Sequence, residues 1–192
     1  MRQFRYTVLQ MKHVSSASTT MWAAIAMIAA MLLSCSPRPA ARPYEVVEVT
    51  GSAFTVRLSA FDEENGWPVP GAYYRFESLL HDGKGSVLAM EFRHDDPVPL
   101  PSQNVRFVTG DFAYLFMGWK YAVTTDRGKS WTVWNAESDL PNWECCNYKL
   151  ISNVEIKNDG IGKMSLKPIA GRRGEVNQLF TSDFGRHWAI TQ

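Results

Sequence analysis

The chain has 192 residues, of which 45% are hydrophobic and 20% charged, a composition that excludes general disorder. Its 20 Lys and Arg residues against 19 Asp and Glu give a formal net charge of +1. Three of the basic residues and none of the acidic ones precede Cys35, so the remainder has 17 basic and 19 acidic residues and a net charge of −2. A charge this close to zero provides no electrostatic basis for nucleic-acid binding, and we expect none.

The N-terminus is basic, and the run from Met21 to Leu33 then has 13 residues without a polar side chain. This run is too short to cross a bilayer, which needs about 20 apolar residues. A basic region followed by a short apolar run is typical of a removable signal peptide, and we expect residues 1–34 to be one. Translation from either Met1 or Met11 preserves this interpretation.

The sequence Leu32-Leu33-Ser34-Cys35 resembles the lipobox of bacterial lipoproteins, and a signal anchor followed by a chance cysteine is the alternative. The resemblance implies that Cys35 is lipidated and is the only membrane attachment. It also implies the outer membrane, facing the periplasm, because Ser36 stands where Asp would signal retention in the inner membrane. Residues 35–43 contain three prolines and are predicted to form an extended tether.

Two further cysteines, Cys145 and Cys146, are adjacent in the sequence. The usual Cα separation of a disulfide exceeds the distance of about 3.8 Å between neighbouring residues. A conventional disulfide within the chain is therefore excluded after lipidation, and a vicinal disulfide is left open.

Two later segments share the pattern [ST]-x-D-x-G-x-x-W, which resembles the Asp-box, or bacterial neuraminidase repeat. A short carboxylate at a turn accepts backbone N–H groups, glycine supplies a positive φ, and tryptophan begins the return strand over the turn. We expect both segments to be structural hairpin tips. The fixed positions are Thr124, Asp126, Gly128 and Trp131 in the first box, and Thr181, Asp183, Gly185 and Trp188 in the second.

The similarity between the two copies begins before the boxes. The asparagines Asn104 and Asn153 are 49 residues apart, whereas Asp126 and Asp183 are 57 apart. The difference of eight predicts a longer loop in the second copy, near residues 167–174. Periods of this size are typical of β units of the propeller-blade type.

We expect an all-β fold of two packed antiparallel sheets built from such hairpin repeats, with residues 44–103 as an N-terminal lobe and 104–192 as a C-terminal Asp-box lobe. A closed propeller needs four or more blades of about 40–50 residues, for which the chain is too short. Alternation predicts that Val46, Phe54, Val56 and Leu58 point inwards. The predicted strands are 45–49, 54–59, 72–80, 87–93, 105–108, 112–117, 120–124, 131–135, 150–156, 161–168, 175–181 and 188–191.

The sequence contains no pattern that indicates catalysis, a metal ion or a cofactor. The histidines at 81, 94 and 187 have no paired spacing of the kind that zinc sites use. Phe92-Arg93-His94-Asp95 is only superficially similar to the arginine motif of sialidases, and the rest of the sialidase site is not recognisable. We therefore expect a protein that is not an enzyme.

The loop that joins the two repeats, residues 136–148, is the most promising contact surface. Aromatic residues with charged neighbours are enriched in protein interfaces, which predicts Trp143 as an anchor with Asp139 and Glu144 as its charged rim. The alternative is that Trp143 packs beneath the loop.

The signal peptide, the proline-rich tether, the all-β body and the terminal Asp-boxes together resemble the immunity lipoproteins paired with type VI secretion lipase effectors. This resemblance implies a periplasmic protein that binds a secreted lipase effector and neutralises it by stoichiometric occlusion, without a cofactor. An envelope assembly or scaffold lipoprotein is one alternative, and a sialidase-like sugar-binding module is another.

Overall fold

A computed structural model describes residues 42–63, 71–83, 85–94, 97–143, 148–168 and 176–190. The chain divides into two units, Met1–Ala41 and Arg42–Gln192, and every described residue belongs to the second. The predicted signal peptide and Cys35 therefore lie outside the described residues.

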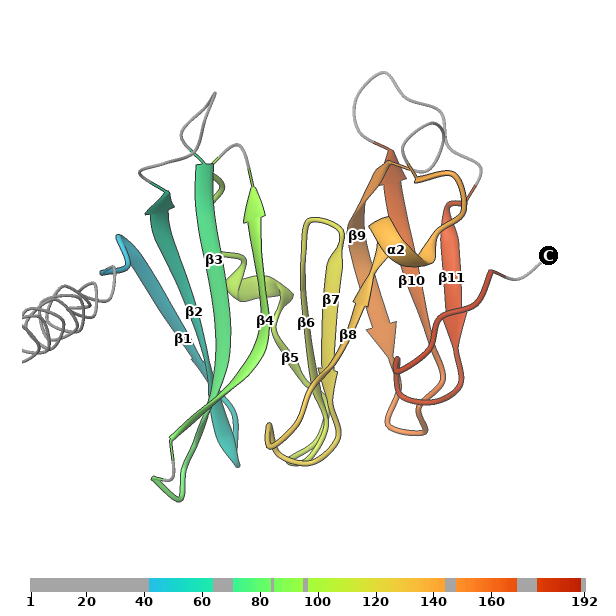
Figure 1. Ribbon diagram of the computed structural model, residues 1–192. Coiled ribbons are helices and arrows are strands. Elements are labelled where there is room, and N and C mark those ends of the chain that lie inside the picture. Colours follow the sequence, from blue (N-terminus) through green and yellow to red (C-terminus); the bar gives the residue numbers. More distant parts are fainter. Residues whose placement is uncertain are drawn as a thin grey trace, which may run out of the picture. The chain divides into compact units, whose positions relative to one another are not determined.

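The described residues form three antiparallel sheets, each an up-and-down meander (Figure 1). The first has the strand order β1-β2-β3-β4, the second β5-β6-β7-β8 and the third β11-β10-β9. The strands are β1 (Glu45–Thr50), β2 (Phe54–Glu63), β3 (Gly71–Leu80), β4 (Ser86–His94), β5 (Arg106–Phe107), β6 (Ala113–Met117), β7 (Lys120–Thr124), β8 (Thr132–Asn135), β9 (Lys149–Ile156), β10 (Gly162–Pro168) and β11 (Gln178–Thr181). Two short helical segments, η1 (Ser102–Asn104) and α2 (Ala136–Asp139), complete the elements that the structure defines.

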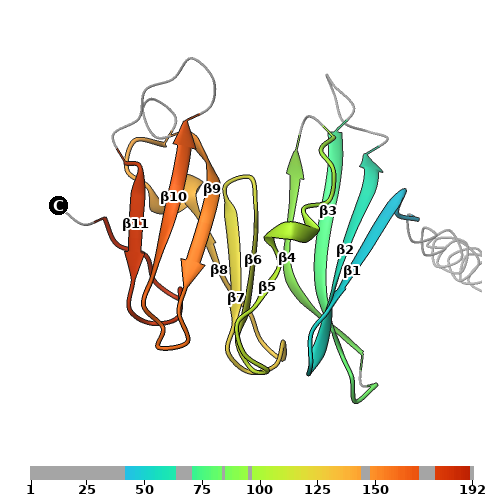
Figure 2. The same ribbon diagram turned by 180° about the vertical axis from the view of Figure 1, so that it is seen from behind.

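The second sheet lies between the other two, and both of its faces are buried (Figures 1 and 2). All five residues of β6 are buried because successive side chains of a strand point to opposite faces. Ala113, Leu115 and Met117 pack against the first sheet, whereas Tyr114 and Phe116 pack against the third. The uninterrupted apolar run of β6 is thus the sequence of a strand buried on both sides.

The all-β prediction is confirmed, and none of the three sheets closes into a barrel. The number of sheets differs from the prediction: we expected two packed sheets, each like one or two propeller blades, and the described residues form three, with one sheet for each repeat. The first sheet and the second share one core, to which Leu58 and Phe76 contribute from one side and Leu115 and Ala122 from the other. The predicted boundary at residue 103 consequently separates two sheets within the compact unit Arg42–Gln192.

The two outermost faces carry ion pairs beside exposed apolar residues such as Val46 and Phe180. On the first sheet, Arg57 forms an ion pair with Glu48 at 2.8 Å, and on the third Lys163 forms one with Glu155 at 3.2 Å. Val46 belongs to this outer face and is 47% exposed, which corrects its prediction as an inward residue. Val47 and Val49 pack against the core instead, because they share one face of β1, whereas Val46 shares the other face with Glu48 and Thr50.

The expected longer loop of the second copy falls between β10 and β11. The β6–β7 connection is Gly118-Trp119, whereas β10 ends at Pro168 and β11 begins at Gln178. Of the predicted last strand, 188–191, the structure describes residues 188–190, which pair through a single bridge between Phe180 and Ala189. Both boxes lie at the same end of the sheets, with α2 and the β6–β7 turn at the opposite end (Figure 1).

Candidate functional site

The first Asp-box is the turn between β7 and β8. The carboxylate of Asp126 accepts hydrogen bonds from the Thr124 hydroxyl at 2.8 Å, the Ser130 N–H at 2.9 Å and the Ser130 hydroxyl at 2.6 Å. The Thr124 hydroxyl oxygen in turn accepts from the Gly128 N–H at 3.0 Å. Each polar residue of the pattern therefore satisfies backbone or side-chain groups of the turn itself.

The second Asp-box follows β11 and repeats this geometry. Asp183 accepts from the Thr181 hydroxyl at 2.8 Å and the His187 N–H at 3.0 Å, and the His187 ring nitrogen Nδ1 lies 2.5 Å from its second oxygen. The Thr181 hydroxyl accepts from the Gly185 N–H at 3.0 Å. His187 thus replaces Ser130 as the second donor to the box carboxylate.

Both turns contain two successive residues with positive φ. In the first box Arg127 has φ 66° and Gly128 has φ 77°, and in the second Phe184 has φ 65° and Gly185 has φ 80°. The left-handed conformation is unfavourable for residues with a Cβ atom. The motif specifies glycine only at Gly128 and Gly185, so the sequence pattern did not predict the positive φ of Arg127 and Phe184.

Hydrogen bonding lowers the pKa of both box carboxylates. Partial burial alone would raise the pKa of Asp183, but the bonds from His187 and Thr181 outweigh this effect and lower its pKa to about 2. Burial is likewise outweighed at Asp126, whose pKa is lowered by bonds from Ser130 and Thr124. Both groups are therefore held as carboxylates, the form that accepts the bonds of the turn.

Asp126→Ala and Asp183→Ala are each expected to lower the free energy of unfolding by about 1–3 kcal/mol. Each change removes the acceptor of three contacts within its turn. Because the turns are exposed, water can replace some of the lost hydrogen bonds, and we expect the loss of stability to lie towards the lower end of this range. Urea denaturation of the two variants and the wild type measures the effect.

The pH dependence of the wild type provides a control for Asp183. A carboxyl whose pKa is about 2 when folded and near its ordinary 3.8 when unfolded stabilises the fold above about pH 4. This contribution is lost as the pH falls towards 2. Asp183→Asn retains an acceptor and cannot titrate, so its stability should depend less on pH in this window. Identical pH profiles would contradict the prediction.

Each box also packs against the sheet that precedes its own. In the first box, Trp131 Nε1 donates to the Ser78 hydroxyl at 3.2 Å, and that hydroxyl donates to the Gly128 carbonyl at 2.5 Å. In the second, the Trp188 ring meets Tyr121 edge-on at 5.5 Å between centroids. The tryptophans were expected to cover their own turns, and the contacts with Ser78 and Tyr121 have no signature in the sequence.

The inter-repeat loop has a different role from the one predicted for its aromatic residue. Trp143 is 8% exposed and packs against Tyr148 at 5.0 Å and Trp119 at 6.5 Å between ring centroids. This burial corrects its assignment as an exposed anchor and favours the alternative that it packs beneath the loop. Asp139 is exposed on α2, where its carboxylate accepts from the Asn135 N–H at 3.3 Å, and Glu144 lies outside the described residues.

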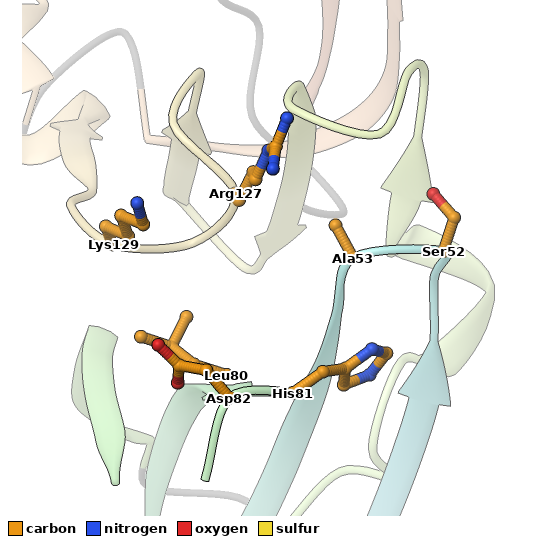
Figure 3. Close-up of a pocket in the computed structure, with 7 residues that line it drawn as sticks. All are labelled: Ser52, Ala53, Leu80, His81, Asp82, Arg127 and Lys129. Carbon is orange, nitrogen blue, oxygen red and sulfur yellow. The ribbon is translucent and has the colours of Figure 1, made fainter. Parts of the chain in front are cut away.

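A pocket of about 360 Å³ lies where the first box meets the β1–β2 and β3–β4 turns (Figure 3). The His81 ring is hydrogen-bonded to the Thr55 hydroxyl at 3.3 Å, and Arg127 pairs with Asp111 at 2.5 Å. Figure 3 shows the His81 ring and the Arg127 guanidinium directed away from each other. The lining side chains therefore do not converge on one ligand position. They are Ser52, Ala53, Leu80, His81, Asp82, Arg127 and Lys129.

A buried lysine in the third sheet gave no signal in the sequence. Lys149 is fully buried, and its ammonium group donates to the Val176 carbonyl and, at 3.0 Å, to the side-chain oxygen of Asn177. Buried cations are stable in proteins only when they are paired or hydrogen-bonded. Lys149 thus fixes the chain where it enters β11.

Two further properties of the described residues bear on function. No group of three or more His, Cys, Asp or Glu side chains within them is arranged to hold a metal ion. Of the helices in this part of the chain, none has the length and hydropathy to cross a membrane. Cys145 and Cys146 lie outside the described residues.

Comparison of the chain with models of protein families, with curated proteins and with solved structures found no match.

Proposed function

We propose that this chain is a lipid-anchored periplasmic immunity protein that neutralises a secreted lipase effector by occluding it, without a cofactor. The observation that carries the proposal is the double burial of the central sheet, which gives the exposed turns a rigid support. A preorganised surface loses less entropy on binding and can hold its partner tightly. The lipobox-like sequence at Cys35 supports delivery to the compartment that such effectors enter.

The side chains around the pocket also favour binding over chemistry. A catalytic group must reach the reacting atoms, with its base or acid partner within hydrogen-bond distance. His81 and Arg127 are engaged by Thr55 and Asp111, and both partnerships hold turns in place. Their geometry is that of residues that shape a surface.

The contact with the effector is assigned to the exposed side of α2. Glu137, Ser138 and Asp139 are exposed there, while Leu140 and Trp143, further along the same loop, are buried. The buried aromatic side chains fix the loop. The Glu137 and Asp139 carboxylates are exposed to a partner, and Asp139 is held in place by hydrogen bonds from the Asn135 N–H and the Ser138 hydroxyl. Complementary charge at such a position governs specificity and the rate of association.

The decisive experiment expresses a lipase effector encoded beside this chain in the periplasm, with and without the full-length protein. Co-expression is expected to restore growth, and the purified partners should bind with a Kd of about nanomolar order. Asp139→Arg is expected to weaken binding by about tenfold or more. Lys157→Glu, in the exposed β9–β10 turn, is the matched control and should bind like the wild type.

Equal killing in both cultures would contradict the immunity function and make an envelope scaffold the leading candidate. Protection together with unchanged binding by Asp139→Arg would retain the function and exclude the assigned surface. Circular dichroism of the variant establishes that its fold is intact before binding is compared.

A further inference from the structure

The two contacts between an Asp-box and the preceding sheet have the same design. In each, the box glycine and tryptophan pack against a residue in the third strand of the preceding sheet, Ser78 in β3 or Tyr121 in β7. Within each repeat, the residue before the box glycine donates its N–H to the loop ahead of the second strand. Arg127 donates to the Asp111 carbonyl at 3.1 Å, and Phe184 donates to the Gly160 carbonyl at 3.0 Å.

The two contacts differ in how their polar atoms are satisfied. At the first, the Trp131 indole and the Ser78 hydroxyl are both hydrogen-bonded across the interface. At the second, the Tyr121 hydroxyl and the Trp188 indole nitrogen are buried and have no hydrogen-bond partner among the residues that the structure describes. When the first contact separates, the Trp131 indole and the Ser78 hydroxyl exchange their hydrogen bonds across the interface for bonds to water. When the second separates, the Tyr121 hydroxyl and the Trp188 indole gain bonds to water that they lack in the closed state.

The segments that follow the two boxes also differ. After the first box, β8 pairs with β7 over four positions, from Val123 with Thr132 to Lys120 with Asn135. After the second, the described chain pairs with β11 through the single bridge between Phe180 and Ala189. The segment 182–190 is therefore held by fewer ladder contacts than its counterpart.

We propose that residues 182–190 form a strap that opens from the second sheet while the first box remains closed. Opening breaks the Phe184–Gly160 bond, the Phe180–Ala189 bridge and the bond from Arg186 to Thr125. The bonds of Asp183 with Thr181 and His187 lie within the segment around the box and are preserved. The open state exposes the rings of Tyr121 and Trp188, which are residue types enriched in protein interfaces. This device is independent of the proposed immunity function.

Amide hydrogen exchange on the full chain tests the strap. The amides of Phe184 and Ala189 are expected to exchange about tenfold faster than the matched amide of Arg127. Tyr121→Phe removes one unpaired hydroxyl while keeping the ring, and should slow exchange at Phe184 and Ala189 by about fivefold or more. Exchange at Arg127 should not change in this variant.

Ser78→Ala is the matched control at the first contact. It removes the acceptor of Trp131 and should speed exchange at Arg127 while leaving Phe184 unaffected. Equal protection of the two boxes in the wild type would overturn the proposal. Unchanged or faster exchange at Phe184 in Tyr121→Phe would overturn it as well.

Discussion

Gly185→Ala is expected to lower the free energy of unfolding by about 3 kcal/mol or more, from two additive causes. Gly185 has φ 80°, in the left-handed region that disfavours a Cβ atom. A Cβ atom on its backbone would overlap the Tyr121 hydroxyl oxygen and lie 2.8 Å from Ile156 Cδ1. Because both neighbours are in packed positions, the new methyl group must displace the box from the second sheet.

The same change at Gly83 separates the two causes. Gly83 has φ 73°, and a Cβ atom there would have nothing within 4 Å. Gly83→Ala is therefore expected to cost only the conformational part, about 1–2 kcal/mol. Chemical denaturation of the two variants measures the difference. If both variants lose the same stability, the box glycine does not act as a contact between sheets.

The positions of the strands were predictable because their signal is local. The residues of β6 form an apolar run bounded by a turn and a Gly-Trp pair, and the two boxes share four fixed residue types. Turn chemistry and alternation depend on neighbours within a few positions of the chain. These features are therefore visible in a single sequence.

The stacking of the sheets was not predictable for the opposite reason. Ser78 and Trp131 are 53 residues apart and have no shared pattern, yet their hydrogen bond joins the first box to the first sheet. The fold class was predicted correctly, but three sheets formed where two were expected, because no sequence pattern states which sheet faces meet. Trp143 illustrates the same difficulty, since a tryptophan in a polar loop is compatible with an exposed anchor or with a buried support, and its burial depends on distant rings.

The burial of Lys149 was also not predictable from the sequence. Lys149 is the first residue of β9, and lysine is rarely buried without partners. Its partners, Val176 and Asn177, are 27 and 28 residues further along the chain. Only the pairing of β9 with β10, which returns the chain to β11, brings these residues together.

Cys35→Ala is expected to abolish both incorporation of labelled fatty acid and fractionation with membranes. The thiol of this residue is the group that a lipobox presents for acylation, and alanine has no nucleophile. The replacement lies in the unit Met1–Ala41, separate from the unit that contains the three sheets. The variant should therefore unfold at the same temperature as the wild type, so that loss of the anchor is distinguished from loss of the fold.

The double variant Cys145→Ala/Cys146→Ala is the control for the chemistry, because it leaves Cys35 as the sole cysteine of the chain. It should retain the label and the membrane fraction in full. Continued labelling of Cys35→Ala would place the lipid elsewhere and exclude the lipobox interpretation. If Cys35→Ala loses the label but still protects against the effector, occlusion requires only the unit Arg42–Gln192. Binding and anchoring then reside in different units of the chain.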